Sequence, residues 1–135
     1  MCQCYHPEVE FSDPVFPALR GDAACAMWQM LILRGKDLAI EFGDIDANES
    51  RGRAHWIARY TFSKTGRTVV NDIHADFEFR DGLIARHHDR FDLWRWSRMA
   101  LGPQGALLGW VPAVQNKIRA EAAAALAVYR AQRGV

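Results

Sequence analysis

Hydrophobic and polar residues alternate with a period of two over the middle of the chain. The clearest run covers residues 55–62, where every second side chain is apolar or aromatic: Trp56, Ala58, Tyr60 and Phe62. A period of two is typical of β-strands, because successive side chains of a strand point to opposite faces. The same pattern predicts strands over 38–43, 69–79 and 83 to about 94. Short turns at 64–67 and 80–82 join neighbouring strands, so we expect a mostly antiparallel sheet.

Two segments follow a helical period instead. Apolar residues three to four apart predict a helix from Asp22, as its N-cap, through about Arg34, and Gly35 ends it. A second, alanine-rich helix is predicted over 112–132. Before it, residues 101–105 are expected to form a loop and 107–112 an apolar connection. Three prolines in residues 5–17 exclude a helix there and predict short extended pieces and turns. Helices on either side of an antiparallel sheet indicate an α+β fold.

Composition narrows the classes of function. The 135 residues are half hydrophobic, which fits a single domain over 1–135. Seventeen basic and sixteen acidic side chains leave a net charge of +1, too little for a general nucleic-acid binder. No apolar run approaches the roughly 20 residues of a membrane span. We expect a cytoplasmic protein, because the N-terminus has no secretory signal pattern and three cysteines are too few for a disulfide framework.

Four segments resemble a known superfamily. They are Phe-Ser-Asp-Pro-Val at 11–15, the Gly-Arg hairpin at 66–67, Phe-Glu-Phe-Arg-Asp-Gly-Leu-Ile at 77–84 and His-His-Asp-Arg-Phe-Asp at 87–92. With the order of elements, they resemble the nuclear transport factor 2-like superfamily, which includes the SnoaL-type polyketide cyclases and ketosteroid isomerase. The resemblance covers a core at 5–96 and leaves 97–135 as a C-terminal helical extension.

The resemblance implies a cystatin-like architecture, in which a curved sheet forms a cone with helices packed on it. It also implies an apolar ligand pocket in the cone and a homodimer through the outer face, where Ile57 and Thr61 would lie. Family members usually begin with a long helix. Residues 1–7 look like the end of the second helix, so the first is expected to be missing from this chain. The pocket would then be closed by an upstream segment, the C-terminal tail or a partner chain.

Asp13 is the first candidate for chemistry. If it shares a strand face with Phe11 and Val15, desolvation would raise its pKa toward the range of a general base. The resemblance places Asp13 on the catalytic aspartate of ketosteroid isomerase, in the same Asp-Pro-Val context. The alternative is an Asp-Pro turn in which the carboxylate accepts a hydrogen bond from a backbone N–H. The sequence leaves both open.

His87 and Asp89 are the second candidates, because residues two apart on a strand face the same side. SnoaL-type cyclases are similar here, with a His-x-Asp whose aspartate acts as acid and base. The alternative is a structural, hydrogen-bonded His–Asp pair, or pairing with Arg86 or Arg90. His74 and Asp76 have the opposite parity to Phe77 and are expected on the outside.

No cofactor is expected, and no metal either, because Cys2-Gln3-Cys4 lacks a second pair of ligands at suitable spacing. Six further residues are expected to bind a substrate in the cone. The six are Tyr60, Trp56, Phe62, Asn71, Phe91 and Trp94.

These residues lead to two hypotheses for the function. The first is a cofactor-independent enzyme (isomerase, cyclase, dehydratase or hydrolase) that acts on a small apolar metabolite through Asp13, Asp89 and His87. The second is a non-catalytic binding or dimerisation module, whose pocket would be filled by side chains such as Trp94 or Trp110.

Overall fold

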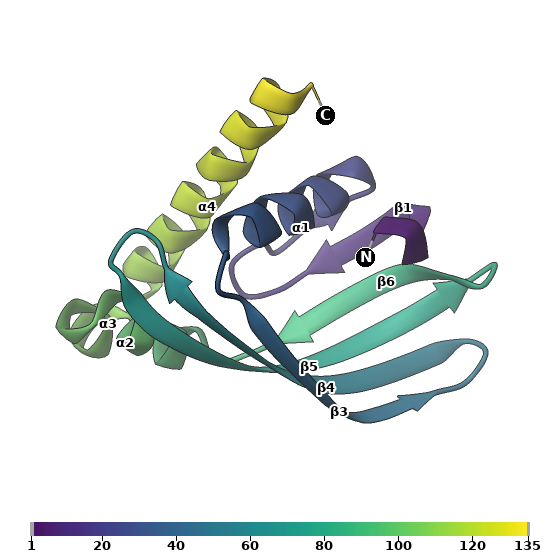
Figure 1. Ribbon diagram of the computed structural model, residues 1–135, viewed down its shortest axis with the longest axis horizontal. Coiled ribbons are helices and arrows are strands. Elements are labelled where there is room, and N and C mark those ends of the chain that lie inside the picture. Colours follow the sequence, from purple (N-terminus) through teal and green to yellow (C-terminus); the bar gives the residue numbers. More distant parts are fainter. Residues whose placement is uncertain (1, 135) are drawn as a thin grey trace.

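One mixed sheet is the frame of the molecule. The computed structural model describes residues 2–134, and within them six strands form one sheet in the order β2-β1-β6-β5-β4-β3 (Figure 1). The strands are β1 (Tyr5–Ser12), β2 (Leu19–Arg20), β3 (Ala39–Ala47), β4 (Arg51–Phe62), β5 (Arg67–Arg80) and β6 (Leu83–Arg90). All neighbours pair antiparallel except β1 and β6, which run parallel and set Phe11 opposite His87. The predicted α+β fold with a mostly antiparallel, curved sheet is confirmed.

Helices cover the inner face of the sheet. Helix α1 (Asp22–Arg34) lies across it, and the long C-terminal helix α4 (Pro112–Arg133) runs beside α1 (Figure 1). The predicted apolar stripe of α4 packs on the cluster that α1 and β1 form, with Leu126 buried and Ala122 and Tyr129 half-buried. Of the helices in residues 2–134, none combines the length and the apolar character that a bilayer crossing requires.

The end of β6 differs from the prediction. The strand stops at Arg90 instead of near Trp94, and helix α2 (Leu93–Leu101) begins directly after it. The reason is a helix cap: the Asp92 carboxylate accepts a hydrogen bond from the Arg95 backbone N–H. On a helix Trp94 and Trp96 do not share one face, so Trp96 is buried whereas Trp94 is 38% exposed.

One further prediction for the C-terminal part was wrong. The expected loop at 101–105 is largely helical, because α3 (Pro103–Leu108) starts at Pro103, a residue well suited to the first helical turn. In the apolar segment that follows, Leu107 is 72% and Trp110 63% exposed, so these side chains do not fill the interior.

The N-terminal part of the structure differs from the prediction in two places. Residues 5–7 belong to β1 and only Cys2–Cys4 forms a helical turn, η1, of the 3₁₀ type. Thus the segment is not the end of an α-helix: Pro7 lies in a strand whose pairing with β6 is irregular between Tyr5 and Glu10. Helix α1 covers the predicted residues, but its N-cap is Gly21, at φ 53°, and Asp22 is the first helical residue.

Candidate active site

A chain of hydrogen bonds connects α1, β1 and β6 in the interior. The Trp28 Nε1–H group donates to the Tyr5 hydroxyl oxygen over 2.8 Å. The same oxygen lies 2.7 Å from Nδ1 of His87, and Nε2 of His87 lies 2.7 Å from Oδ1 of Asp89. The predicted pair of His87 and Asp89 is therefore in contact, and both side chains face the interior.

The chemistry of the four groups fixes the direction of the protons. An indole N–H can only donate, so the Tyr5 oxygen accepts from Trp28 and its own proton is available to His87 Nδ1. A neutral His87 then carries its proton on Nε2 and donates it to the Asp89 carboxylate. The chain thus ends on one oxygen of Asp89, which it holds in a fixed orientation.

Aromatic rings enclose His87 on several sides. Its ring stacks on Trp28 with centroids 6.0 Å apart and contacts Phe11 and Phe77 at 5.0 and 4.6 Å. The residue is only 1% exposed, and both of its nitrogens have partners. His87 consequently has no atom left for a ligand, and what it can do is position Asp89.

Asp13 stands at the turn that follows β1. Its Oδ1 accepts hydrogen bonds from the backbone N–H groups of Val15 and Phe16, at 2.7 and 2.6 Å. Burial, with a smaller contribution from the charge of Asp89, raises the pKa of the carboxyl from 3.8 to about 7, against the lowering effect of these two hydrogen bonds. The two interpretations of Asp13 are thus compatible, because one oxygen holds the turn while the group as a whole has a raised pKa.

The second oxygen of each aspartate has no partner. Oδ2 of Asp13 and Oδ2 of Asp89 make no hydrogen bond or ion pair with any residue in the range 2–134. In the same range, every polar side-chain atom that is fully shielded from solvent has a partner. Each Oδ2 atom therefore still touches solvent-accessible space, although Asp89 as a residue is only 2% exposed.

Tyr60 and Asn71 add polar groups on the inner face. The Tyr60 hydroxyl oxygen accepts from Nε1 of Trp96 at 2.8 Å, which leaves its proton free to be donated elsewhere. Burial raises the pKa of Tyr60, and the charge of Asp13 contributes, so the two groups are within electrostatic reach. Asn71 is 7% exposed, and its amide forms no side-chain hydrogen bond within the described part of the chain.

Three of the predicted apolar residues lie on the same inner face. Trp56 is buried, Phe62 meets Trp96 edge-on at 5.3 Å, and Phe91 packs between the clusters around these residues. Trp94 does not belong to the site. It lies on the outer side of α2, where its Nε1 donates to the Ala106 carbonyl oxygen, because the helix that replaces the predicted strand end turns it away.

Two hollows of the surface lie away from the aspartates. One of about 370 Å³ lies between α4 and the segment that follows Asp13, with Phe16, Leu126 and Arg119 among its lining residues. Another lies beside Pro7 and Arg80. Neither is lined by Asp13 or Asp89. The interior between α1 and the sheet is instead occupied largely by aromatic side chains, Trp28 included.

Sequence reasoning missed three residues that support the site. Tyr5 and Trp28 form the first half of the hydrogen-bond chain, and the Arg119 Nε–H donates to the Pro14 carbonyl oxygen at 2.8 Å, next to Asp13. A signal for Tyr5 existed, since Tyr5, Val9 and Phe11 are the buried positions of one strand face once an irregularity at Pro7 is allowed. No sequence signal connects Arg119 with a turn 105 residues away.

Comparison with known proteins gives matches of two kinds. A family model described as SnoaL-like domain matches residues 1–87. Among solved structures, a candidate SnoaL-like polyketide cyclase from Jannaschia sp. CCS1 superposes with a TM-score of 0.66 at 14% identity, covering 75% of this chain and 76% of that one. A candidate polyketide cyclase from Xanthomonas campestris has a TM-score of 0.59 at 23% identity, with 73% and 81% covered.

TerC, crystallised with polyporic acid, has a TM-score of 0.61 at 18% identity, with 71% of this chain and 79% of that one covered. At these identities the structural matches show the fold alone. A comparison with curated proteins finds no significant match.

Proposed function

Because the chain belongs to the SnoaL-like domain family, we propose that it is a cofactor-independent acid/base enzyme acting on a small, mostly apolar metabolite. The observation that carries the proposal is Asp13, a carboxyl with a pKa of about 7 and one oxygen free of partners. A general base works best when its pKa lies near the operating pH, since it is then both ionised and basic enough to take a proton.

We assign separate roles to the interior groups. Asp13 removes a proton through Oδ2, while its Oδ1 stays fixed by the turn. Asp89 returns or relays the proton through its own free oxygen, and His87 positions it. Tyr60 donates its hydroxyl proton to an oxygen atom of the substrate. Asp89 lies close enough to Asp13 for its charge to contribute to the raised pKa of Asp13.

We infer the class of substrate from the aromatic residues on the inner face of the sheet. Trp56, Phe62 and Phe91 favour flat, apolar molecules with few polar atoms. The candidate polyketide cyclases and the polyporic acid complex among the structural neighbours point the same way, toward aromatic or polyketide-like carbonyl compounds.

The test uses proton exchange, so that it needs no knowledge of the natural substrate. We would follow deuterium uptake at the α-carbon of 2-tetralone, a bicyclic apolar ketone, by NMR in D₂O. The wild type is expected to accelerate exchange, with a rate that rises with pH up to about 7 and then levels off. Asp13→Asn and Asp89→Asn should each lower the catalysed rate by about 10²-fold or more.

Asp46→Asn on the exposed strand β3 is the matched control, and its rate should equal that of the wild type. Wild-type rates in both Asp13→Asn and Asp89→Asn would remove the proposed roles. Circular dichroism of each variant separates a lost proton carrier from a lost fold.

The second candidate, a non-catalytic module, has one observation in its favour. Trp28, rather than the predicted Trp94 or Trp110, occupies the interior against His87, and neither hollow reaches the aspartates. Trp28→Ala would discriminate the two: an enzyme loses its shaped site and its exchange activity, whereas a module with a plugged interior has no exchange activity to lose.

We further propose a homodimer through the outer face of the sheet, in the cytoplasm. Support comes from the family resemblance and from Ile57, an apolar residue on the outward side of β4. Light scattering should give twice the 15.3 kDa of one chain, and Ile57→Glu should reduce it to one. A monomeric wild type would contradict the dimer.

A further inference from the structure

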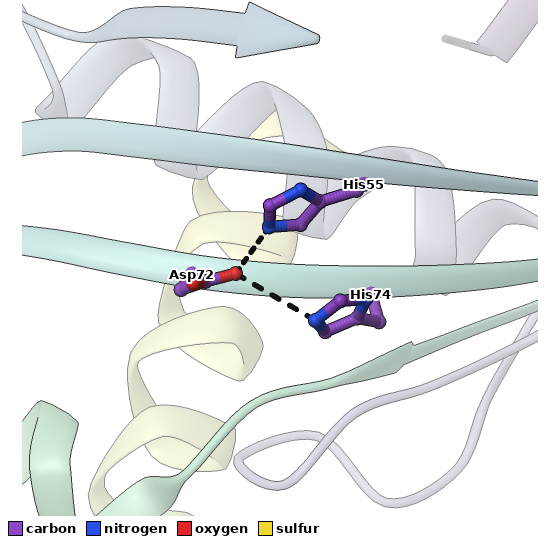
Figure 2. A group of neighbouring side chains, drawn as sticks. All are labelled: His55, Asp72 and His74. Atoms are coloured by element: carbon purple, nitrogen blue, oxygen red, sulfur yellow. Dashed lines mark hydrogen bonds and ion pairs between the residues drawn. The ribbon is translucent and has the colours of Figure 1, made fainter. Parts of the chain in front are cut away.

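Two histidines and an aspartate meet on the outer face of the sheet, opposite the candidate active site. The β4–β5 register sets His55 directly opposite His74, and their rings stack with centroids 4.5 Å apart at 11°. Asp72 lies two residues before His74 and points to the same side. Figure 2 shows the three side chains converging from the two strands.

The ligand-type atoms of the three residues face one another. Oδ1 of Asp72 lies 2.5 Å from Nε2 of His55 and 3.8 Å from Nε2 of His74 (Figure 2). All three atoms lie within 4.8 Å of one another. A metal ion with bonds of about 2.0–2.1 Å holds tetrahedral ligand atoms about 3.3 Å apart, so the set needs to shift by only about 1 Å.

A fourth residue lies near the second nitrogen of His55, where a metal-binding histidine usually has a supporting carboxylate. Nδ1 of His55 lies 3.7 Å from Oδ2 of Asp44, on the side of the ring away from Asp72. Histidines that bind metals through one nitrogen usually donate the other N–H to a carboxylate, which fixes the ring. Asp44 has the positive φ of 51° at the β3 irregularity, which is where the strand turns this carboxylate toward His55.

We propose that His55, Asp72 and His74 bind a divalent transition-metal ion such as Zn²⁺. Two imidazoles and one carboxylate suit such an ion, and three protein ligands leave further coordination positions open. In the single chain the side chains are accessible, with His55 27%, Asp72 42% and His74 60% exposed, so an ion can enter from solvent before two chains associate through this face. The site goes beyond the proposed proton transfer, because it lies on the other face of β5 and uses none of the same residues.

The charges nearby are mixed. Asp72 and Asp44 supply negative charge, and Arg90, paired opposite His74, is engaged by Asp76 at 3.0 Å. Arg53 lies two residues before His55 on the same face of β4, opposite Asp76 in the register. The bound ion would bridge β4 and β5 and so stabilise their pairing.

The experiment is a titration of the tag-free, metal-stripped chain with ZnCl₂ by calorimetry, together with CoCl₂ monitored by visible absorption. One ion per chain is expected, with cobalt bands that report nitrogen and oxygen ligands. Asp72→Asn and His74→Ala should each weaken zinc binding at least tenfold, and Asp44→Asn about tenfold.

Glu78→Gln is the matched control, since it removes a carboxylate from the same face of the same strand, four residues beyond His74, and zinc binding should not change. Absence of binding, or equal binding in His74→Ala and the wild type, would overturn the proposal. So would one ion per two chains, which would mean a site built between molecules. The variants' activity in the 2-tetralone assay should stay at the wild-type rate, so the two proposals fail independently.

Discussion

Asp13 would be easier to bury as a neutral group than as the anion that proton transfer needs. Its pKa rises from 3.8 in an unfolded chain to about 7 in the fold, so the folded state holds the proton more tightly. Stability contributed by this group is therefore present at low pH and lost as pH rises from about 4 to about 7.

Asp13→Asn should remove this dependence. The amide keeps an oxygen for the Val15 and Phe16 N–H groups but carries no charge. Relative to the wild type, the variant should gain stability between pH 4 and pH 8, by up to about 4 kcal/mol for a shift of this size. Urea unfolding of both proteins at the two pH values measures the gain. An equal difference at both pH values would show that the carboxyl has an ordinary pKa.

Replacing Tyr5 tests the chain of hydrogen bonds from Trp28 to Asp89. Tyr5→Phe keeps the ring but leaves Nε1 of Trp28 and Nδ1 of His87 without a partner in the interior. An unpaired buried polar group costs about 1–3 kcal/mol, so the free energy of unfolding should fall by that order. Tyr129→Phe is the control, because that hydroxyl makes only an exposed contact of 3.5 Å with Gln29. Equal stability of the two variants would contradict the chain.

At the scale of elements, the corner between α2 and α3 depends on one glycine. A Cβ added at Gly105 would lie 1.9 Å from the Ser97 carbonyl oxygen, so the backbones of the two helices could not approach. Gly105→Ala should therefore cost about 3 kcal/mol or more. Gly43→Ala serves as the control, since a Cβ there meets nothing within 4 Å. Thermal unfolding compares them, and similar midpoints would mean that the helices separate at little cost.

Most elements could be predicted because their signals are local. The period of two in β4 and β5 and the apolar stripes of α1 and α4 fix which face each element buries. The end of β6 could not be predicted by period alone, since Trp94 and Trp96 suit a strand as well as a helix. The Asp92 cap decides between them.

The candidate site was predictable only in part. His87 and Asp89 share a strand face, and Asp13 stands in a recognisable motif, so local pattern and resemblance suffice for them. Tyr5, Trp28 and Arg119 reach the site through contacts between distant segments. Likewise, nothing in the linear spacing of His55 and His74 shows that the β4–β5 register places them face to face, which is why no metal site was expected.

At the scale of the whole molecule, the C-terminal helix reaches back to the N-terminal turn. Arg119→Ala removes the hydrogen bond to Pro14 and should loosen the turn that holds Asp13. We expect a several-fold lower exchange rate on 2-tetralone and a loss of about 1 kcal/mol in stability. Lys117→Ala, two residues away on the exposed side of α4, is the control. Unchanged exchange in Arg119→Ala would show that the turn holds Asp13 without α4.

The parallel pairing of β1 with β6 also bears on how the chain is made. Tyr5 and His87 are 82 residues apart, so a ribosome must add that many residues after Tyr5 before β1 meets its partner. Until then Val9 and Phe11 have no sheet to join, and a chaperone that binds apolar nascent segments would find them open. The antiparallel strands β3 to β5 can pair as they emerge, because each is followed by its neighbour. The candidate active site therefore cannot form until β6 has been made, later than the pairing of β3 with β4.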